Sequence, residues 1–428
     1  MRELFPTRDN LANKISYYHL LLLMASLPFD RFYSHLILIS FALHTLIQFN
    51  RLEVKPVFNW RTLLLQSVFF ITVISTIYTA YKLEAFQEWG KDITIFLLPL
   101  LFCFTRLDIK KYREPLLLGF SLICVATILY LYFDAFRTIR FYKLPFSSIF
   151  SATFTNHNFS EPIDMHATFF SMQLAIALVY LLTVLIKERM IHWKLFYAVC
   201  ICVLAAGLLQ LCSKSVVFCV IITINLLLPY LLLKGYQRWK FILSTVAISL
   251  ILMIGLFSLG SFKERYITDL KVDLSQKTSA ETTDPRLARW ETALGLITES
   301  PMIGHGAGSE IGLLHQAYFT KKYYNSFLNK LNAHNQYLSF LLKAGIVGLL
   351  AYLTTLTFGF RIAFAKKDLL FTSFMLLVAI VSLSENLLDV DKGIFFYAYF
   401  FSFFVFSNET KNKTAKEEKQ HKYELEPA

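Results

Sequence analysis

Charged residues are scarce in this sequence. Asp, Glu, Lys and Arg make up 17% of the 428 residues, whereas ordinary soluble domains carry about 25%. Hydrophobic residues make up 56%, and they fall in long runs rather than in amphipathic patterns. Runs of about 18 or more apolar residues can cross a bilayer as helices. The composition therefore excludes a soluble enzyme, a disordered protein and a small secreted module held by disulfides.

The polar–apolar alternation of a membrane β-barrel is missing as well, since its strands would alternate over about 10 residues. We therefore predict an all-α, polytopic integral membrane protein, with about twelve transmembrane helices in a single membrane domain over 1–428. The predicted spans are 16–29, 33–49, 62–81, 93–105, 115–135, 167–186, 195–212, 215–233, 241–259, 336–358, 368–388 and 393–406.

Signals for a metal or a cofactor are also absent from the sequence. The six cysteines lie in or beside apolar runs without metal-site spacing, so we expect them to be small buried apolar residues. His305, His315 and His334 match no zinc pattern. The glycines of 304–308 lack the preceding strand and the lysine of a nucleotide-binding loop. We expect no metal and no cofactor.

The net charge of +12 follows from membrane topology rather than from a nucleic-acid partner. Lys and Arg crowd every second connection between the predicted spans, and cytoplasmic loops collect these residues. The alternation predicts that both termini are cytoplasmic. The apolar stretch from Tyr17 lacks a small-residue cleavage pattern, so we expect it to be the first span and not a signal peptide.

Three segments stand apart from the spans. The stretch 260–335 is predicted to be a large periplasmic loop between the ninth and tenth spans, and 136–166 is a second outer segment. The tail 407–428 is rich in Lys and Glu and poor in apolar residues, which predicts a disordered cytoplasmic end.

The long outer loop carries the strongest cluster of polar motifs. Asp284-Pro285 is a helix-start signal, and on that helix Arg286 and Trp290 share a face. The helix should end near Glu299, ahead of Pro301. Glycines then allow a tight turn, and the His334-Asn335 pair follows where the chain re-enters the membrane.

Cations at an outer membrane surface suit a phosphate ligand. The planar fork of arginine binds phosphate with two hydrogen bonds, and lipid-linked donors present a diphosphate at this depth. Taken alone, Arg286 and Arg289 fit equally well as surface arginines near lipid headgroups. Lys214, in a short break between the seventh and eighth spans, fits either a snorkelling anchor or a phosphate ligand.

Other residues could handle an acceptor. His334 has the ordinary pKa range of a general base, although for the residue taken alone an interfacial histidine bonded to its own loop is the favoured interpretation. Glu161 and His166 could line an acceptor site or merely belong to a capped helix start. Glu385 is a carboxylate inside or beside the eleventh span and is a functional candidate, unless it is simply hydrated.

The order of motifs resembles the O-antigen ligase superfamily. The motifs are Arg-x-x-x-Trp (286–290), Pro-x-x-Gly-x-Gly-x-Gly (301–308), His-Asn-x-Tyr-Leu (334–338) and Gly-Ile-x-Gly (345–348). This superfamily contains O-antigen ligases, O-antigen polymerases and protein O-oligosaccharyltransferases. The resemblance implies a glycosyltransferase of the bacterial inner membrane with its active site on the periplasmic face. Its donor would be a glycan on undecaprenyl diphosphate, and its acceptor a hydroxyl of a lipid A–core sugar or of another glycan.

The resemblance also implies roles for individual residues. His334 and Arg286 are expected to be catalytic, and Lys214 stands where the family often has a second arginine. The residues themselves, apart from the resemblance, lead us to expect contacts to the diphosphate or the acceptor from Lys214, Arg289, Asn335, His166, Glu161 and Glu385. The expected partners are the lipid-linked donor, the acceptor and membrane lipids. A polymerase, a protein-directed transferase and a transporter of lipid-linked glycans remain alternatives, although the two similar halves of many transporters are not seen.

Overall fold

The computed structural model describes residues 9–49, 58–258, 260–275 and 284–408, and it contains helices but no strand within them. Six helical segments in these ranges are long and apolar enough to cross a membrane, and two shorter helices are apolar. The six are α6 (Ile109–Phe141), α8 (Ala167–Lys187), α9 (Ile191–Leu211), Lys214–Leu232, Gly235–Gly255 and α18 (Gln336–Ala365). The helical membrane class is confirmed, while the number of twelve spans stays a prediction.

The remaining elements complete the bundle and its connections. The segment Lys214–Leu232 consists of α10 (Lys214–Ile222), η4 (Thr223–Leu227) and α11 (Leu228–Leu232), and Gly235–Gly255 lies in α12 (Gly235–Phe257). The other bundle helices are α1 (Leu11–Ser26), α2 (Arg31–Ile47), α3 (Trp60–Leu65), α4 (Ser67–Ser75), α5 (Lys82–Phe104), α19 (Leu369–Val381) and α20 (Asp391–Ser407). Short connecting elements are η1 (Phe146–Phe150), η2 (Ala152–Phe154), α7 (Asn156–Ser160), η3 (Glu161–Ile163), α13 (Gly260–Lys263), η5 (Glu264–Thr268) and α14 (Asp269–Asp273).

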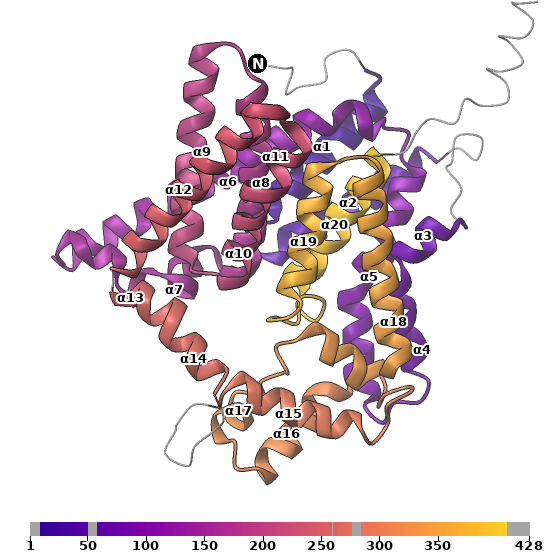
Figure 1. Cartoon of the computed structure of the whole chain (residues 1–428). Coiled ribbons are helices and arrows are strands. Elements are labelled where there is room, and N and C mark those ends of the chain that lie inside the picture. The colour runs from indigo at the N-terminus through magenta and orange to yellow at the C-terminus, as the bar shows by residue number, and fades with distance from the viewer. Residues whose placement is uncertain (1–8, 50–57, 259, 276–283, 409–428) are drawn as a thin grey trace, which may run out of the picture.

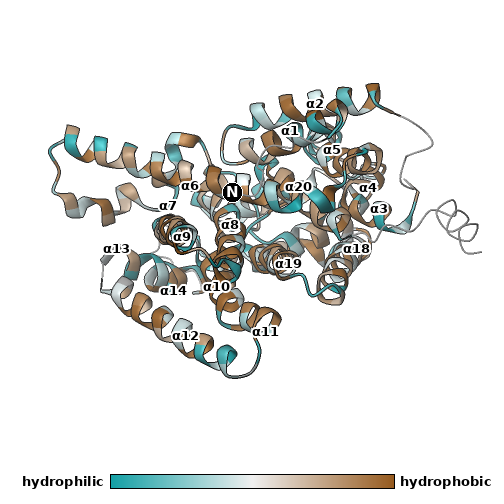
Figure 2. Cartoon of the chain, turned by 90° about the horizontal axis from the view of Figure 1, so that it is seen from above, coloured by the Kyte–Doolittle hydropathy of each residue, from teal (hydrophilic) through white to brown (hydrophobic). Residues whose placement is uncertain are grey.

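Helix α20 forms the centre of the bundle. Every residue from Gly393 to Ser407 is buried, and the helix packs against α5, α6, α8 and α19. Its phenylalanines meet those of its neighbours, as in the stacked pair Phe371–Phe404, whose ring centroids are 5.4 Å apart. Apolar residues cover most of α8, α9 and α19 in the view along the bundle (Figure 2). Such packing, rather than exclusion from water, holds helices together in lipid.

The two ends of the bundle differ. At one end Asp9 accepts a hydrogen bond from Tyr112, and Asp368 accepts hydrogen bonds from Arg113 and Asn408. The other end is covered by residues 284–335, here called the loop cap (Figure 1). The loop cap contains α15 (Arg286–Ile297), α16 (Ser309–Thr320) and α17 (Tyr324–Leu328). We call the uncovered side the open end.

The predicted helix after Pro285 is confirmed, because α15 begins at Arg286 and ends at Ile297. Asp284 does not cap this helix. Its carboxylate accepts a hydrogen bond from the Ser326 backbone N–H at 2.6 Å and so ties the start of α15 to α17.

Two predicted spans run too far along the chain. Helix α4 ends at Ser75 rather than near residue 81, and α19 ends at Val381 rather than near residue 388. The residues that follow each helix bond to other segments instead of continuing it. After α4, the Thr79 hydroxyl donates to the Ala307 carbonyl, and after α19, Glu385 is bonded to His334. The predicted disorder of the tail concerns residues 409–428, which lie outside the described ranges.

The loop cap is fastened to α18 by two glycines that face each other. Gly345 has φ 61 and breaks α18, and Gly304 has φ 68 in the loop. A Cβ on Gly304 would lie 2.6 Å from the backbone nitrogen of Gly345, and a Cβ on Gly345 would overlap the backbone of Met302. The close approach lets the N–H groups of His305 and Gly306 bond to the carbonyls of Leu342 and Lys343.

We predict that Gly345→Ala destabilises the folded protein by about 1–3 kcal/mol or more, because the new Cβ meets both a positive φ and backbone atoms. The thermal unfolding midpoint of the purified protein in detergent measures this. Gly295→Ala is the matched control, since no atom lies within 4 Å of its Cβ position in α15. We expect it to gain about 0.5–1 kcal/mol, and an equal loss in both variants would contradict the packing argument.

Candidate active site

His334 and Glu385 form a pair at the junction of the loop cap and the bundle. His334 has φ 48 and directly precedes Asn335, the residue that caps α18. Its Nδ1 lies 3.1 Å from Oε2 of Glu385, which is in the connection between α19 and α20. A carboxylate only accepts hydrogen bonds, so Nδ1 carries the proton and Nε2 keeps its lone pair. The pair thus presents the basic nitrogen of His334 away from Glu385.

The charge of Glu385 supports this assignment. Burial alone would raise the pKa of this carboxyl, but the hydrogen bond from His334 and the charge interactions with His334, His166 and Arg286 lower it to about 2. Glu385 is therefore ionised at neutral pH and can stabilise a protonated His334.

Arg286 joins this pair from the first turn of α15. Its Nη1 donates to the Ser384 carbonyl at 3.1 Å, and its Nη2 lies 3.9 Å from Oε1 of Glu385. Trp290, one turn later on the same face, donates from Nε1 to the Ala333 carbonyl at 2.9 Å. Arg286 and Trp290 therefore lie on one face of α15, as their spacing predicts, and Trp290 bonds to the residue that precedes His334.

Lys214 and Arg286 converge on one carboxylate. Oδ2 of Asp273, the last residue of α14, lies 3.8 Å from Nζ of Lys214 and 3.5 Å from Nε of Arg286. All three side chains are about a quarter exposed. An oxygen of an anionic ligand at this place would meet the same two cations. Spacing gave no reason to single out Asp273.

Two imidazoles lie beside the His334–Glu385 pair. The ring centroids of His157 and His166 are 4.2 Å apart, and Nδ1 of His166 is buried with no hydrogen-bond partner among the described residues. Burial lowers the pKa of His166 to about 4, with Glu385 opposing that shift. Burial also lowers the pKa of His157, which the sequence analysis missed because it lies in a short polar segment without a motif.

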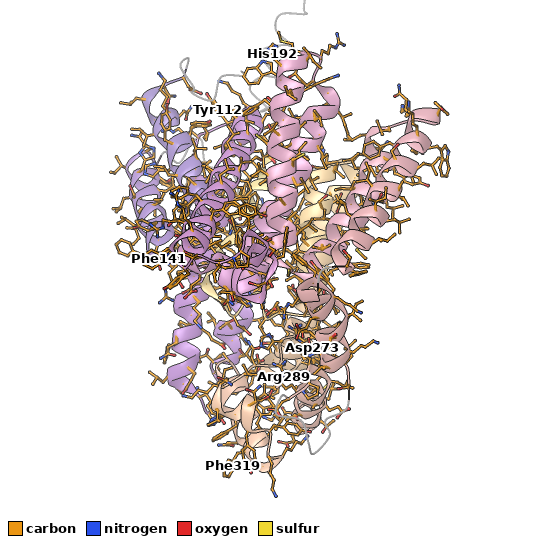
Figure 3. The ribbon with its side chains drawn as sticks, turned by 90° about the vertical axis from the view of Figure 1, so that its left-hand side faces the viewer. Tyr112, Phe141, His192, Asp273, Arg289 and Phe319 are labelled. Atoms are coloured by element: carbon orange, nitrogen blue, oxygen red, sulfur yellow. The ribbon has the colours of Figure 1, made fainter. Side chains whose placement is uncertain are left out.

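The other predicted site residues lie at different depths. Arg289 is buried in the loop cap, and its Nε and Nη1 have no partner among the described residues; Figure 3 labels it together with Asp273. Burial lowers the pKa of Arg289. Asn335 is buried, and its Oδ1 accepts from the N–H groups of Tyr337 and Leu338. Glu161 is exposed, with no side-chain hydrogen bond or ion pair recorded among the described residues.

A buried polar network behind the site was not singled out from the sequence. Lys343 of α18 lies 2.6 Å from Asp389 and 3.4 Å from Glu88, whose other oxygen accepts from the Gly308 N–H. Glu310 accepts from Ser339 and from Asn386. A lysine within an apolar run, as in the predicted span 336–358, was the available signal, because intramembrane charges are functional candidates.

We predict that the protonation of His166 contributes to the pH dependence of folding stability. Between pH 6.5 and about 4 the unfolded chain binds this proton and the folded protein does not. Stability should therefore fall as the pH decreases through that window, by up to about 3 kcal/mol. Thermal unfolding midpoints across this range should show a shallower slope in His166→Gln. His315→Gln, in the loop cap, should keep the wild-type slope, and identical slopes in all three proteins would contradict the assignment.

Comparison with known proteins gives two matches. Residues 215–353 match the family model described as O-Antigen ligase. An uncharacterized protein of Haemophilus influenzae is 30% identical over 125 residues, which is 28% of this chain and 31% of that protein. The chain thus covers about a third of the length of this relative. The family match contains Asp273, Arg286 and His334, together with all four motifs of the loop cap and α18. The match over residues 215–353 supports the resemblance to the O-antigen ligase superfamily that the motifs indicated.

Proposed function

We propose that this protein is a membrane glycosyltransferase of the O-antigen ligase type. It transfers a glycan from undecaprenyl diphosphate to an acceptor hydroxyl, with a sugar of lipid A–core as the acceptor. The observation that carries the proposal is the convergence of a basic nitrogen and two cations at one end of the bundle. His334 is bonded to Glu385 at 3.1 Å, and Arg286 lies between Glu385 and the carboxylate that it shares with Lys214.

The cations serve the leaving group in this proposal. The sugar–phosphate bond of the donor breaks, its electron pair stays on the diphosphate oxygen, and negative charge grows there. Arg286 and Lys214 stabilise this charge, with Arg289 as a further cation in the same cap. The phosphate ester bond supplies the driving force, so the reaction needs no nucleotide.

His334 acts on the acceptor as a general base in this proposal. The acceptor oxygen attacks the anomeric carbon and transfers its proton to Nε2, which Glu385 leaves free by holding Nδ1. The ionised Glu385 then stabilises the resulting imidazolium. In this proposal Asn335 orients His334, the unpaired Nδ1 of His166 bonds an acceptor hydroxyl, and Glu161 lies at the entrance.

The location follows the charge pattern. We place the protein in the bacterial inner membrane with the loop cap in the periplasm and both termini in the cytoplasm. Cations of the open end, such as Lys110, Lys111 and Arg113, agree with the rule for cytoplasmic loops.

A polymerase or a protein-directed transferase would use the same groups, because these enzymes differ in the acceptor. A transporter of lipid-linked glycans is less well supported, because transport requires no base held by an ionised carboxylate.

We predict that His334→Ala and Arg286→Ala each lower transfer by about 100- to 1,000-fold. The test deletes the gene in its host and complements it at matched expression, with lipopolysaccharide resolved on a gel. Loss of long-chain glycan from lipid A–core, with lipid-linked polymer accumulating, would support the ligase. His315→Gln, a histidine of the same cap that stacks on Phe327, should complement fully.

Other gel patterns would redirect or remove the proposal. Core carrying a single repeat would indicate a polymerase. An unchanged lipopolysaccharide profile in the deletion strain would overturn both the ligase and the O-antigen polymerase.

We also predict that Asp273→Asn tightens donor binding, because the Asp273 carboxylate competes with the diphosphate for Arg286 and Lys214. The partly exposed ion pair limits the gain to about fivefold in the donor KM, without a loss of kcat. Steady-state assays with a purified lipid-linked donor measure both constants. Asp269→Asn is the control on the same helix, since Asp269 pairs with Arg265 instead. A weaker donor affinity in Asp273→Asn would contradict the competition.

A further inference from the structure

The open end of the bundle holds a cavity of about 560 Å³, far from the loop cap. It lies between the start of α6, the end of α8, the start of α9, the end of α11 and the turn from α18 to α19. Figure 3 shows this end at the top, where Tyr112 and His192 are labelled, opposite Phe319 of the loop cap. None of the residues assigned to the transfer reaction lines it.

The wall of the cavity is apolar and aromatic. Leu118, Leu232 and Leu370 line it together with Trp193 and Tyr197 of α9. The two aromatic rings stack with their centroids 6.2 Å apart. Such a wall suits hydrocarbon, and tryptophan and tyrosine are common at the level where lipid headgroups begin.

The rim of the cavity carries uncommitted positive charge. Lys187, Lys366 and Lys367 line it, are exposed, and form no ion pair within the described part of the chain. The fourth cation, Arg113, is already held by Asp368 at 2.6 Å.

The acidic residues of the cavity cancel only part of this charge. Asp368 is bonded to Arg113 and to Asn408. The Glu188 carboxylate accepts the N–H groups of Arg189 and Met190. Glu188 keeps its negative charge, because backbone N–H groups are neutral, and Glu114 is exposed, so two carboxylates stand against three lysines.

The cavity also lies at the right depth for a lipid. Helices α6, α8, α9 and α18 are long enough to cross a membrane and all begin or end at it. Basic pockets between transmembrane helices at the cytoplasmic surface bind anionic lipid headgroups. A ligand that fits the rim and the wall together has a negative head and a hydrocarbon chain.

We propose that this cavity binds an anionic phospholipid. The phosphate lies among Lys187, Lys366 and Lys367, and the first part of an acyl chain packs on Trp193 and Leu232. The lipid fills the space between the helix ends and holds the α18–α19 turn against α6 and α9. The site is independent of the proposed transfer reaction.

The test places the full-length protein in phosphatidylcholine vesicles that contain a minority of brominated lipid. Bromine on an acyl chain quenches tryptophan fluorescence on contact. The part due to Trp193 is the difference between the wild type and Trp193→Phe. We expect brominated phosphatidylglycerol to quench this part more strongly than brominated phosphatidylcholine with the same chains.

Charge variants then test the rim. Each of Lys366→Gln and Lys367→Gln should lower the preference for the anionic lipid by about fivefold. The matched controls are the single variants Lys110→Gln and Arg361→Gln. Both residues are exposed cations of the open end that do not line the cavity. Both controls should keep the wild-type preference for the anionic lipid. Addition of inorganic phosphate should leave the Trp193 quenching in place, since phosphate alone lacks the chain.

Equal quenching by the two brominated lipids would overturn the proposal. The same holds if the lysine variants and the controls lose the preference equally, because surface charge in general would then explain it. Displacement of the brominated lipid by inorganic phosphate would replace the lipid with a simple anion site and would also overturn the proposal.

Discussion

One buried cation holds the candidate site together. Lys343 lies within α18, and removing a lysine from water is expensive unless opposite charges surround it. Its Nζ contacts Asp389 at 2.6 Å and Glu88 at 3.4 Å. These contacts join α18 to α5 and to the connection between α19 and α20. Loss of Asp389 would leave Lys343 with the longer contact to Glu88, so the pair of carboxylates keeps the three segments in register.

Lys343 is connected to His334 through a series of short polar contacts. Asp389 accepts from Asn386, whose Oδ1 accepts the N–H of Asn335 at 2.8 Å. Asn335 in turn caps α18 and fixes the residue before it, His334, in a left-handed conformation. The pairing of His334 with Glu385 is therefore the end of a chain of bonds rather than an isolated contact. A base held in this way needs little reorganisation when a proton arrives.

Local signals in the sequence predicted what local physics determines. Hydropathy gave the helical membrane class, and Pro285 gave the start of α15. Hydropathy also predicted a span over 368–388, which is longer than α19, because a hydropathy profile contains no information on hydrogen bonds to distant segments. Asp273 was missed for the same reason. Its partners Lys214 and Arg286 come from separate segments of the chain, and no spacing rule reports such contacts.

The two carboxylates near Arg286 are held unequally, and the difference suits the proposed reaction. Asp273 is 27% exposed on a five-residue helix, and its Oδ2 lies 3.5 Å from Arg286 and 3.8 Å from Lys214. Glu385 is 13% exposed and is bonded to His334. An incoming diphosphate can replace the first carboxylate at little cost, since exposed ion pairs contribute little. It cannot replace the second without leaving His334 unsupported. In the proposed reaction, the donor diphosphate would thus replace Asp273 at Arg286, while Glu385 keeps His334 in the geometry that the acceptor requires.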